Sequence, residues 1–289
     1  MNLATPISIQ KLQAALHVKA KQSPEYRFYS LYDKVYRKDV LAHACALCKA
    51  NRGESGVDGQ TFADIEAYGL ERFLGELAQS LSSRTYRPSA VRRVYIPKPD
   101  DPSKQRPLGI PTIRDRVVQA AAVLVLAPIF EADLPPEQYA YRQGGSALDA
   151  VRHVHTLLSA GYRQVVDADL SGYFDSIPHA ELMKCLARRI CDASLLHLVK
   201  MWLEMAVEEI DDRGHKQRST RSRDEARGTP QGAPISPLLS NLYMRRFVLG
   251  WKVLGHAERL NAKIVNYADD FVICCRGTAK AAMATMRIM

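Results

Sequence analysis

The segment N-Y-A-D-D-F-V-I, residues 266–273, places two adjacent carboxylates between apolar runs. The runs at 264–265 and 271–273 predict two short buried strands joined by a tight turn. Because Asp is a common turn residue, Asp269 and Asp270 could simply be solvated at the tip of a hairpin. Alternatively, the two carboxylates bind a divalent cation such as Mg²⁺, which prefers oxygen ligands. This second interpretation predicts a further acidic residue at another strand end.

A second acidic segment, V-V-D-A-D-L-S-G-Y-F-D, occupies residues 165–175. Residues two apart in a strand share a face, so Asp167 and Asp169 are expected on one side, with Asp175 beyond the break at Gly172. If this strand end adjoins the hairpin tip in one sheet, the carboxylates could hold two metal ions about 3.5–4 Å apart, as in-line phosphoryl transfer requires. The pattern indicates a nucleotidyl transferase or a nuclease, with an ordinary acidic sheet edge as an equal alternative.

Positive charge is concentrated in two segments of this 289-residue chain, whose formal net charge is +9. Residues 84–116 contain nine Lys and Arg against three acidic residues, and residues 213–227 contain six against two. A solvated basic surface without a partner is one explanation. Clustering favours a polyanion such as nucleic acid, because each neutralised phosphate releases counterions.

Other features of the sequence exclude several classes of protein. No stretch approaches the roughly 18 apolar residues of a membrane span, and the N-terminus lacks an apolar signal core. We therefore expect a cytoplasmic protein that contacts no membrane. Cys45 and Cys48 form one C-x-x-C pair after His43, but a zinc site would lack its other half. We expect all six cysteines to be reduced and mostly buried.

Helices and strands must position the acidic segments. Apolar periodicity and turn residues predict helices at 8–22, 31–50, 64–80, 112–130, 146–159, 179–190, 193–208, 237–254 and 278–289. Strands are expected at 86–97, from 165 onward, and on both sides of the Asp269-Asp270 turn. Residues 98–104 are predicted to form a tight turn and 211–227 a loop or exposed hairpin.

Five motifs, in their order along the chain, resemble the reverse transcriptase domain of bacterial group II intron-encoded proteins and their retroelement relatives. They are R-R-V-Y-I-P-K-P (92–99), R-P-L-G-I-P-T-I-R-D-R-V-V-Q (106–119), D-A-D-L-S-G-Y-F-D-S-I (167–177), G-T-P-Q-G-A-P-I-S-P-L-L-S-N (228–241) and Y-A-D-D (267–270). The upstream L-Y-D-K-V-Y-R and G-V-D-G segments also resemble that family, so the resemblance covers roughly residues 31–280.

The resemblance implies a right-hand polymerase fold of the α+β class, with an antiparallel palm sheet backed by helices. It implies an N-terminal extension and the start of the fingers at 1–85, fingers at 86–163, and a palm at 164–289 in which about 181–227 lies on the finger side. Family members continue into further palm strands and a thumb. Because this chain ends at Met289, we expect the thumb to be absent and the hold on primer and template to be weak.

The resemblance also implies the catalytic residues. Asp169, Asp269 and Asp270 match the metal-binding carboxylates, and the backbone carbonyl of Leu170 matches a further metal ligand. The implied cofactor is a pair of Mg²⁺ ions, with Mn²⁺ as a substitute. Asp167 and Asp175 would then have secondary roles.

Five further residues match nucleotide-binding positions. Lys98 and Arg106 would grip the triphosphate, because point charges and guanidinium forks suit polyphosphate. Phe174 would leave no room for a 2′-hydroxyl, Gln231 would lie near the incoming nucleotide, and a side chain at Gly232 would obstruct the template. Four of these assignments have a structural alternative: a solvated turn for the two basic residues, core packing for Phe174 and an ordinary turn for Gly232.

The function implied by the resemblance is RNA-directed DNA polymerisation in a group II intron-like element of a bacterium. The expected partners are an RNA template, a DNA primer, dNTPs and intron RNA. Two alternatives stay open. One is a non-catalytic maturase-type protein that binds intron RNA through the basic region from Lys11 to Arg52, and the other is an inactive truncated fragment.

Overall fold

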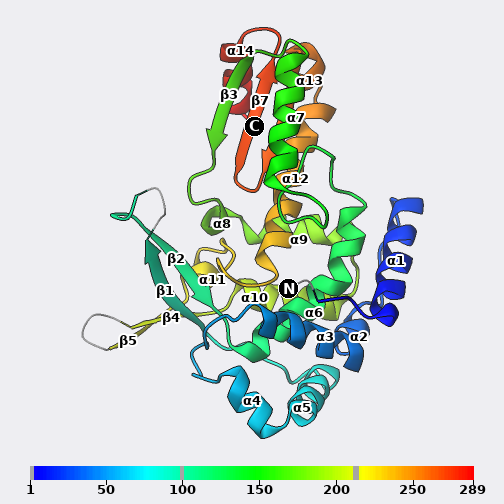
Figure 1. Ribbon diagram of the computed structural model, residues 1–289, viewed down its shortest axis with the longest axis vertical. Helices are drawn as coiled ribbons and strands as arrows, with labels where there is room; N and C mark the ends of the chain where they lie inside the picture. Colours follow the sequence, from blue (N-terminus) through cyan, green and yellow to red (C-terminus); the bar gives the residue numbers. More distant parts are fainter. Residues whose placement is uncertain (1–2, 98–100, 211–214) are drawn as a thin grey trace. The chain divides into compact units, whose positions relative to one another are not determined.

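The computed structural model describes residues 3–97, 101–210 and 215–289. The chain divides into two compact units, each formed by two segments of sequence: unit 1 comprises Met1–Ala132 and Phe174–Ser236, and unit 2 comprises Asp133–Tyr173 and Pro237–Met289 (Figure 1). Both units combine helices with a sheet, which confirms the α+β class. Within the described ranges, no helix has the length and apolar character needed to cross a bilayer.

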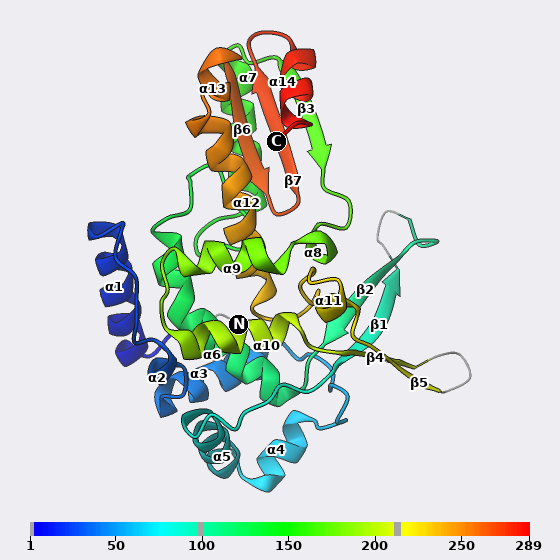
Figure 2. The same ribbon diagram turned by 180° about the vertical axis from the view of Figure 1, so that it is seen from behind.

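Unit 1 is mainly helical. Its helices are α1 (Ile7–Gln22), α2 (Tyr32–Val35), α3 (Lys38–Ala50), α4 (Phe62–Tyr68), α5 (Leu70–Ser82), α6 (Ile113–Glu131), α9 (His179–Ala187), α10 (Ala193–Leu203) and α11 (Arg221–Asp224). Helix α6 contacts α1, α2 and α3 (Figure 2). The Val- and Ala-rich sequence of α6 is buried on most of its surface, which explains why it lacks the polar stripe of a surface helix.

Two helices that the sequence predicts as continuous are divided in the structure. Arg37 adopts an extended backbone (φ −58°, ψ 137°) and separates α2 from α3. Gly69 has φ 105°, a conformation that side chains disfavour, and separates α4 from α5. The helix predicted for 193–208 ends at Leu203, because the chain enters a strand at Val207.

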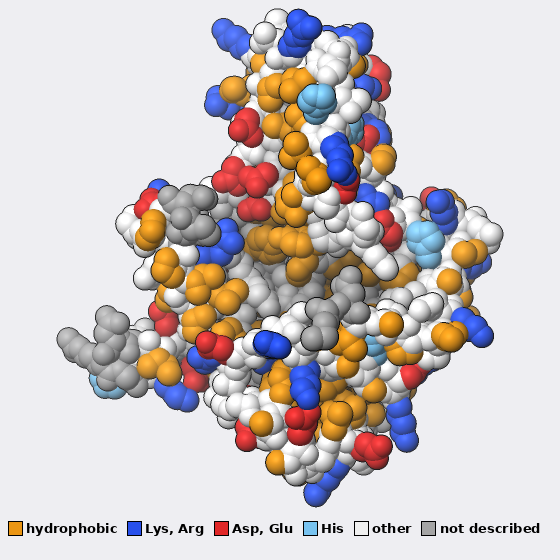
Figure 3. Space-filling view, in the orientation of Figure 1, with side chains coloured by type: hydrophobic (Ala, Val, Ile, Leu, Met, Phe, Trp, Pro, Cys, Tyr) orange, Lys and Arg blue, Asp and Glu red, His pale blue; other side chains and the backbone are white. Residues whose placement is uncertain are grey.

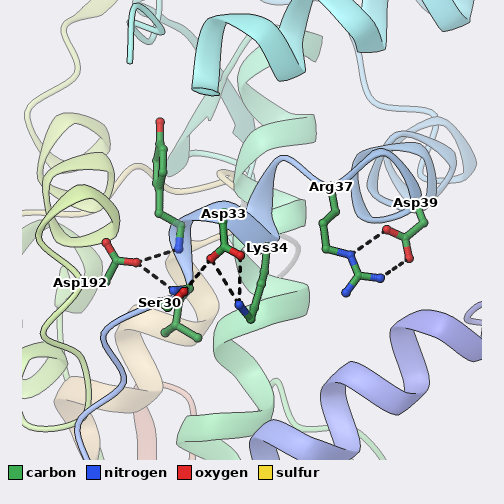
Figure 4. Close-up of polar contacts among 8 residues, drawn as sticks. Ser30, Asp33, Lys34, Arg37, Asp39 and Asp192 are labelled. Atoms are coloured by element: carbon green, nitrogen blue, oxygen red, sulfur yellow. Dashed lines mark hydrogen bonds and ion pairs between the residues drawn. The ribbon is translucent and has the colours of Figure 1, made fainter. Parts of the chain in front are cut away.

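Asp192 connects the N-terminal segment of unit 1 to α10. Its Oδ2 atom accepts hydrogen bonds from the backbone nitrogens of Leu31 and Tyr32, each at 2.8 Å (Figure 4). Its Oδ1 atom caps α10 by accepting from the nitrogens of Ser194 and Leu195 at 3.1 and 3.2 Å. One buried carboxylate therefore accepts hydrogen bonds from backbone N–H groups at the starts of both α2 and α10, which have no partner within their own helices.

The sheet of unit 1 has the order β2 (Gln105–Ile110), β1 (Val91–Pro97), β4 (Val207–Ile210) and β5 (Lys216–Ser219). The β1–β2 and β4–β5 pairs are antiparallel, whereas β1 and β4 are parallel. The strand predicted from residue 86 begins only at Val91. Tyr86 is instead buried, and its hydroxyl donates to the Asp115 carboxylate at 2.6 Å.

Unit 2 contains an antiparallel sheet of the order β3 (Gln164–Asp169), β7 (Asp270–Cys275) and β6 (Ala262–Tyr267). The helices that lie wholly in unit 2 are α7 (Ala147–Ser159), α13 (His256–Arg259) and α14 (Ala279–Met286). Helices α8 (Tyr173–Ser176) and α12 (Ser236–Val253) each include residues of both units. Helices α7, α13 and α14 contact the strands, and the Phe247 ring of α12 lies 5.0 Å from that of Phe271. The prediction of an antiparallel sheet backed by helices is confirmed.

Candidate catalytic site

The sheet of unit 2 brings the two acidic segments together. Strand β3 pairs with β7 so that Asp169 lies directly opposite Asp270, and Asp167 lies opposite Val272. Directly opposed residues of antiparallel strands share a face, with Cα atoms roughly 4.5–5.5 Å apart. The contact continues beyond the ladder, since the Leu170 nitrogen donates to the Asp269 carbonyl oxygen at 3.3 Å.

The paired carboxylates lie on the open face of this sheet. Asp167, Asp169 and Asp270 are exposed and Asp269 is half-buried, whereas residues of the opposite phase, such as Ile273, are buried. Figure 3 shows acidic side chains gathered where β3 ends in Figure 1. The sequence-predicted face shared by Asp167 and Asp169 is therefore confirmed.

Two effects raise the pKa of the Asp270 carboxyl. The larger is loss of water contacts around the carboxyl group of this exposed residue, and the negative charges of Asp269, Asp169 and Asp167 raise the pKa further. A carboxylate set with this repulsion suits a hard divalent cation, whose charge would offset it. In the described part of the chain, however, no group of three or more His, Cys, Asp or Glu side chains is arranged to hold a metal ion. Metal ligation by the three aspartates stays a prediction.

Leu170, the predicted backbone ligand, follows directly after β3. Its carbonyl oxygen accepts a hydrogen bond from the Tyr173 nitrogen at 3.1 Å. A carbonyl oxygen has two lone pairs, so this bond leaves one acceptor site on Leu170 for a ligand. The Leu170 carbonyl and the carboxylates of Asp169, Asp269 and Asp270 thus offer oxygen ligands, which is the ligand type expected for Mg²⁺.

The turn between β6 and β7 consists of Ala268 and Asp269, because Tyr267 pairs with Asp270. Ala268 has φ 58°, which is unfavourable for a residue with a side chain. The Asn266 side-chain nitrogen donates to the carbonyl oxygens of Ala268 at 2.8 Å and Asp270 at 3.0 Å. Asn266 was not among the residues predicted to have a role; its sequence signal is a polar side chain within an apolar strand.

The predicted nucleotide-binding residues Gln231 and Gly232 lie in unit 1, on the loop 228–232. Its backbone is bound to the segment 174–177: the Thr229 nitrogen donates to the Phe174 carbonyl at 2.7 Å, and the Gly228 nitrogen donates to the Ile177 carbonyl at 2.9 Å. The Gln231 side-chain nitrogen donates to the Asp175 carboxylate at 3.2 Å. Phe174, which is half-buried, and Gln231 are therefore held on one local framework.

The same loop is attached to β2. The Gly109 nitrogen donates to the Gln231 carbonyl oxygen at 2.6 Å. Gly232 has φ 98°, and a Cβ atom there would lie 2.7 Å from the Gly109 oxygen and 2.8 Å from Leu108 Cδ1. Glycine at 232 is thus required by contacts within the protein, which supports the structural alternative for this residue.

Of the two basic residues predicted to bind the triphosphate, Arg106 lies within the described residues and Lys98 does not. Arg106 lies on β2, opposite Ile96, and is exposed. Lys98 lies outside the described residues. Arg106, Phe174, Gln231 and Gly232 belong to unit 1, whereas Asp169, Leu170, Asp269 and Asp270 belong to unit 2.

Comparison with known proteins places the chain in a family. Residues 96–289 match the model of the family described as "Reverse transcriptase (RNA-dependent DNA polymerase)". Protein YkfC of Escherichia coli is 33% identical over 312 residues, covering 96% of this chain and 78% of that protein. The group II intron-encoded protein LtrA of Lactococcus lactis is 33% identical over 230 residues.

The match to LtrA covers 78% of this chain but only 36% of LtrA. A solved structure, the "Partial Cas6-RT-Cas1--Cas2 complex", aligns over 89% of this chain and 40% of that chain with a TM-score of 0.49 and 22% identity. The family match covers most of the chain and includes both acidic segments and the 228–232 loop. The chain therefore belongs to the reverse transcriptase (RNA-dependent DNA polymerase) family and is a relative of group II intron-encoded proteins.

Proposed function

We propose that this chain acts as an RNA-directed DNA polymerase domain that adds deoxynucleotides to a primer 3′-hydroxyl. The observation that supports this most directly is the register of β3 on β7, which sets Asp169 opposite Asp270 beside the hairpin that carries Asp269. Reverse transcriptases generally use divalent metals. A family member with this acidic face has the residues that such chemistry needs.

The roles of the chain's own residues follow from this arrangement. Asp169, Asp269 and Asp270, with the Leu170 carbonyl, would hold two Mg²⁺ ions, or Mn²⁺ in their place. Bound ions would lower the pKa of the primer hydroxyl and neutralise charge on the leaving pyrophosphate. In unit 1, Arg106 would bind the triphosphate, while Phe174 would exclude a 2′-hydroxyl and Gln231 would contact the nucleotide. Unit 1 would then supply the fingers and unit 2 the palm.

The test is primer extension by the full chain with an RNA template, a DNA primer, dNTPs and Mg²⁺. Asp269→Asn keeps the side-chain volume but removes the charge, so we expect extension to fall by at least about a hundredfold. Asp167→Asn is a matched control, since Asp167 lies on the same open face but two register positions farther from the tip than Asp169; we expect its rate to stay within about threefold. Extension that survives Asp269→Asn would refute the assignment.

Intron RNA is a second proposed partner, favoured by the group II intron-encoded relatives. A protein named "Nuclear intron maturase 2, mitochondrial" of Arabidopsis thaliana is 27% identical over 42% of this chain. Binding of structured RNA by the basic region from Lys11 to Arg52 would not involve the acidic face. Such binding should therefore persist in Asp269→Asn, and equal affinity for unrelated RNAs would argue against this role.

A further inference from the structure

Three consecutive backbone carbonyls of the acidic turn are held by hydrogen bonds from outside it. The Asn266 amide nitrogen serves the carbonyls of Ala268 and Asp270, at 2.8 and 3.0 Å, and the Leu170 nitrogen serves that of Asp269 at 3.3 Å. Two of these three bonds come from one side chain. The position of the turn on β6 and β7 therefore depends strongly on Asn266.

Asn266 is itself rigidly placed. It is 1% exposed. Its backbone nitrogen donates to the Glu137 carbonyl at 2.8 Å, and its carbonyl accepts from the Tyr139 nitrogen at 3.0 Å. A chain of hydrogen bonds, here called the Asn266 brace, therefore extends from the segment 137–139 through Asn266 on β6 to the turn. All of these residues lie in unit 2.

The chemistry of the contact requires a donor at this position. Both partners of the side chain are carbonyl oxygens, so the NH₂ group must face them, and no isosteric carboxylate or apolar group can replace it. The Oδ1 atom has no hydrogen-bond partner among the described residues. Because burying an unpaired amide oxygen is costly, a role for the NH₂ group gives a reason for Asn at this site.

We propose that Asn266 is a positioning residue of the acidic hairpin: its amide fixes the backbone of Ala268 and Asp270, so that the carboxylates of Asp269 and Asp270 are presented in one orientation before any metal binds. This inference rests on the proposed polymerase function. Ala268 retains an unfavourable positive φ in this turn, and such a conformation persists only where surrounding contacts enforce it. Loss of the amide should therefore release the turn without unfolding the sheet.

The experiment compares two variants of Asn266 with Ile264→Ala. Asn266→Leu keeps the branched shape of the side chain but offers no donor, and Asn266→Ala removes the amide group. Ile264 lies two residues earlier on β6, on the same buried face and 2% exposed, and makes no contact with the turn in the hydrogen bonds described. It controls for general destabilisation of the strand. Using two Asn266 variants keeps the test decisive if one of them folds poorly.

Hydrogen–deuterium exchange of the metal-free protein is the first readout. Exchange of amides in 267–271 should accelerate at least about tenfold in the Asn266 variants but not in Ile264→Ala, after correction for global stability. Unchanged exchange in the turn would overturn the proposal, whatever the enzyme does.

Mn²⁺ binding and kinetics are the second readout. We expect Mn²⁺ affinity to fall about threefold to tenfold and kcat for extension to fall about a hundredfold, with the KM for dNTP little changed, because a small misplacement of reacting groups has a large cost. Equal effects in Ile264→Ala would contradict a positioning role. Asp269→Asn distinguishes failure of the proposed polymerase function from failure of the positioning role of Asn266. If Asp269→Asn leaves both Mn²⁺ binding and extension intact, the proposed function is wrong. The exchange measurement on the Asn266 variants still tests the positioning role independently.

Discussion

Phe174 has two interpretations, as a packing residue and as the residue that excludes a 2′-hydroxyl. Its ring is half-buried, and its backbone carbonyl holds the Thr229 nitrogen at 2.7 Å. The next residue, Asp175, accepts from the Gln231 side chain. Packing and substrate contact are compatible here, because a rigid ring can exclude a hydroxyl only if its backbone is fixed.

We expect Phe174→Ala to relax the choice of sugar. In the proposed role of Phe174, removing the ring would open space beside the nucleotide ribose, so incorporation of ribonucleotides relative to deoxynucleotides should increase at least about tenfold in single-turnover extension. Phe174→Tyr retains a ring and should retain discrimination. An unchanged preference for dNTPs in Phe174→Ala would leave Phe174 as a packing residue only.

At the scale of elements, Asp39 links two helices of the N-terminal region. It lies in the first turn of α3, where a negative charge is favourable. It accepts from Arg37 Nε and Nη2 at 3.0 and 2.7 Å (Figure 4) and from Ser8 Oγ of α1 at 2.7 Å. The hydrogen bond from Arg37 lowers the pKa of the Asp39 carboxyl, with a further contribution from Ser8.

Because this pKa is lower in the folded state, Asp39 stabilises the fold above its unfolded pKa, near 3.8, and the contribution disappears as the pH falls through the folded value. We expect Asp39→Asn to lower the free energy of unfolding by roughly 0.5–1 kcal/mol at neutral pH, since the pair is partly exposed. Urea denaturation at pH 7 and pH 3 measures this. A loss of equal size at both pH values would show that shape, not charge, matters at this position.

For the whole molecule, the dominant property is the net charge of +9. Part of the basic surface is internally neutralised: Lys216 pairs with Glu208 at 3.0 Å, and Glu225 pairs with Arg221 at 2.7 Å and Arg227 at 2.6 Å. The remaining excess favours contacts with phosphates, which position a nucleic acid without reading its sequence.

We therefore expect the affinity for an RNA–DNA duplex to fall by at least about a hundredfold between roughly 50 and 200 mM salt, with little dependence on sequence. Neutralising exposed Arg218 on β5 should reduce the slope of log affinity against log salt by about one. Arg72 of α5, which pairs with Glu76 at 3.1 Å, is the control and should not change it. Fluorescence anisotropy titrations across salt concentrations measure both slopes; a salt-independent affinity would contradict this role of the basic clusters.

From sequence alone, periodicity predicted the hairpin that carries Asp269 and Asp270, because residues two apart in a strand share a face and turn residues mark the strand ends. The α+β class was implied by the resemblance of the ordered motifs to a known family. Local breaks were less visible: one extended residue, Arg37, and one glycine at positive φ, Gly69, divide helices that periodicity predicts as continuous.

Three features become visible only in the folded chain: the register that sets Asp169 opposite Asp270, the attachment of Gln231 to Gly109, and the hydrogen bonds from Asn266 to the turn. These contacts join segments remote in the chain or depend on which way a buried side chain points. Propensity and periodicity describe each segment alone, whereas pairing between segments is set by the common core that they bury. For that reason, the two acidic segments could be identified from sequence, and the hydrogen bonds from Asn266 to the turn could not.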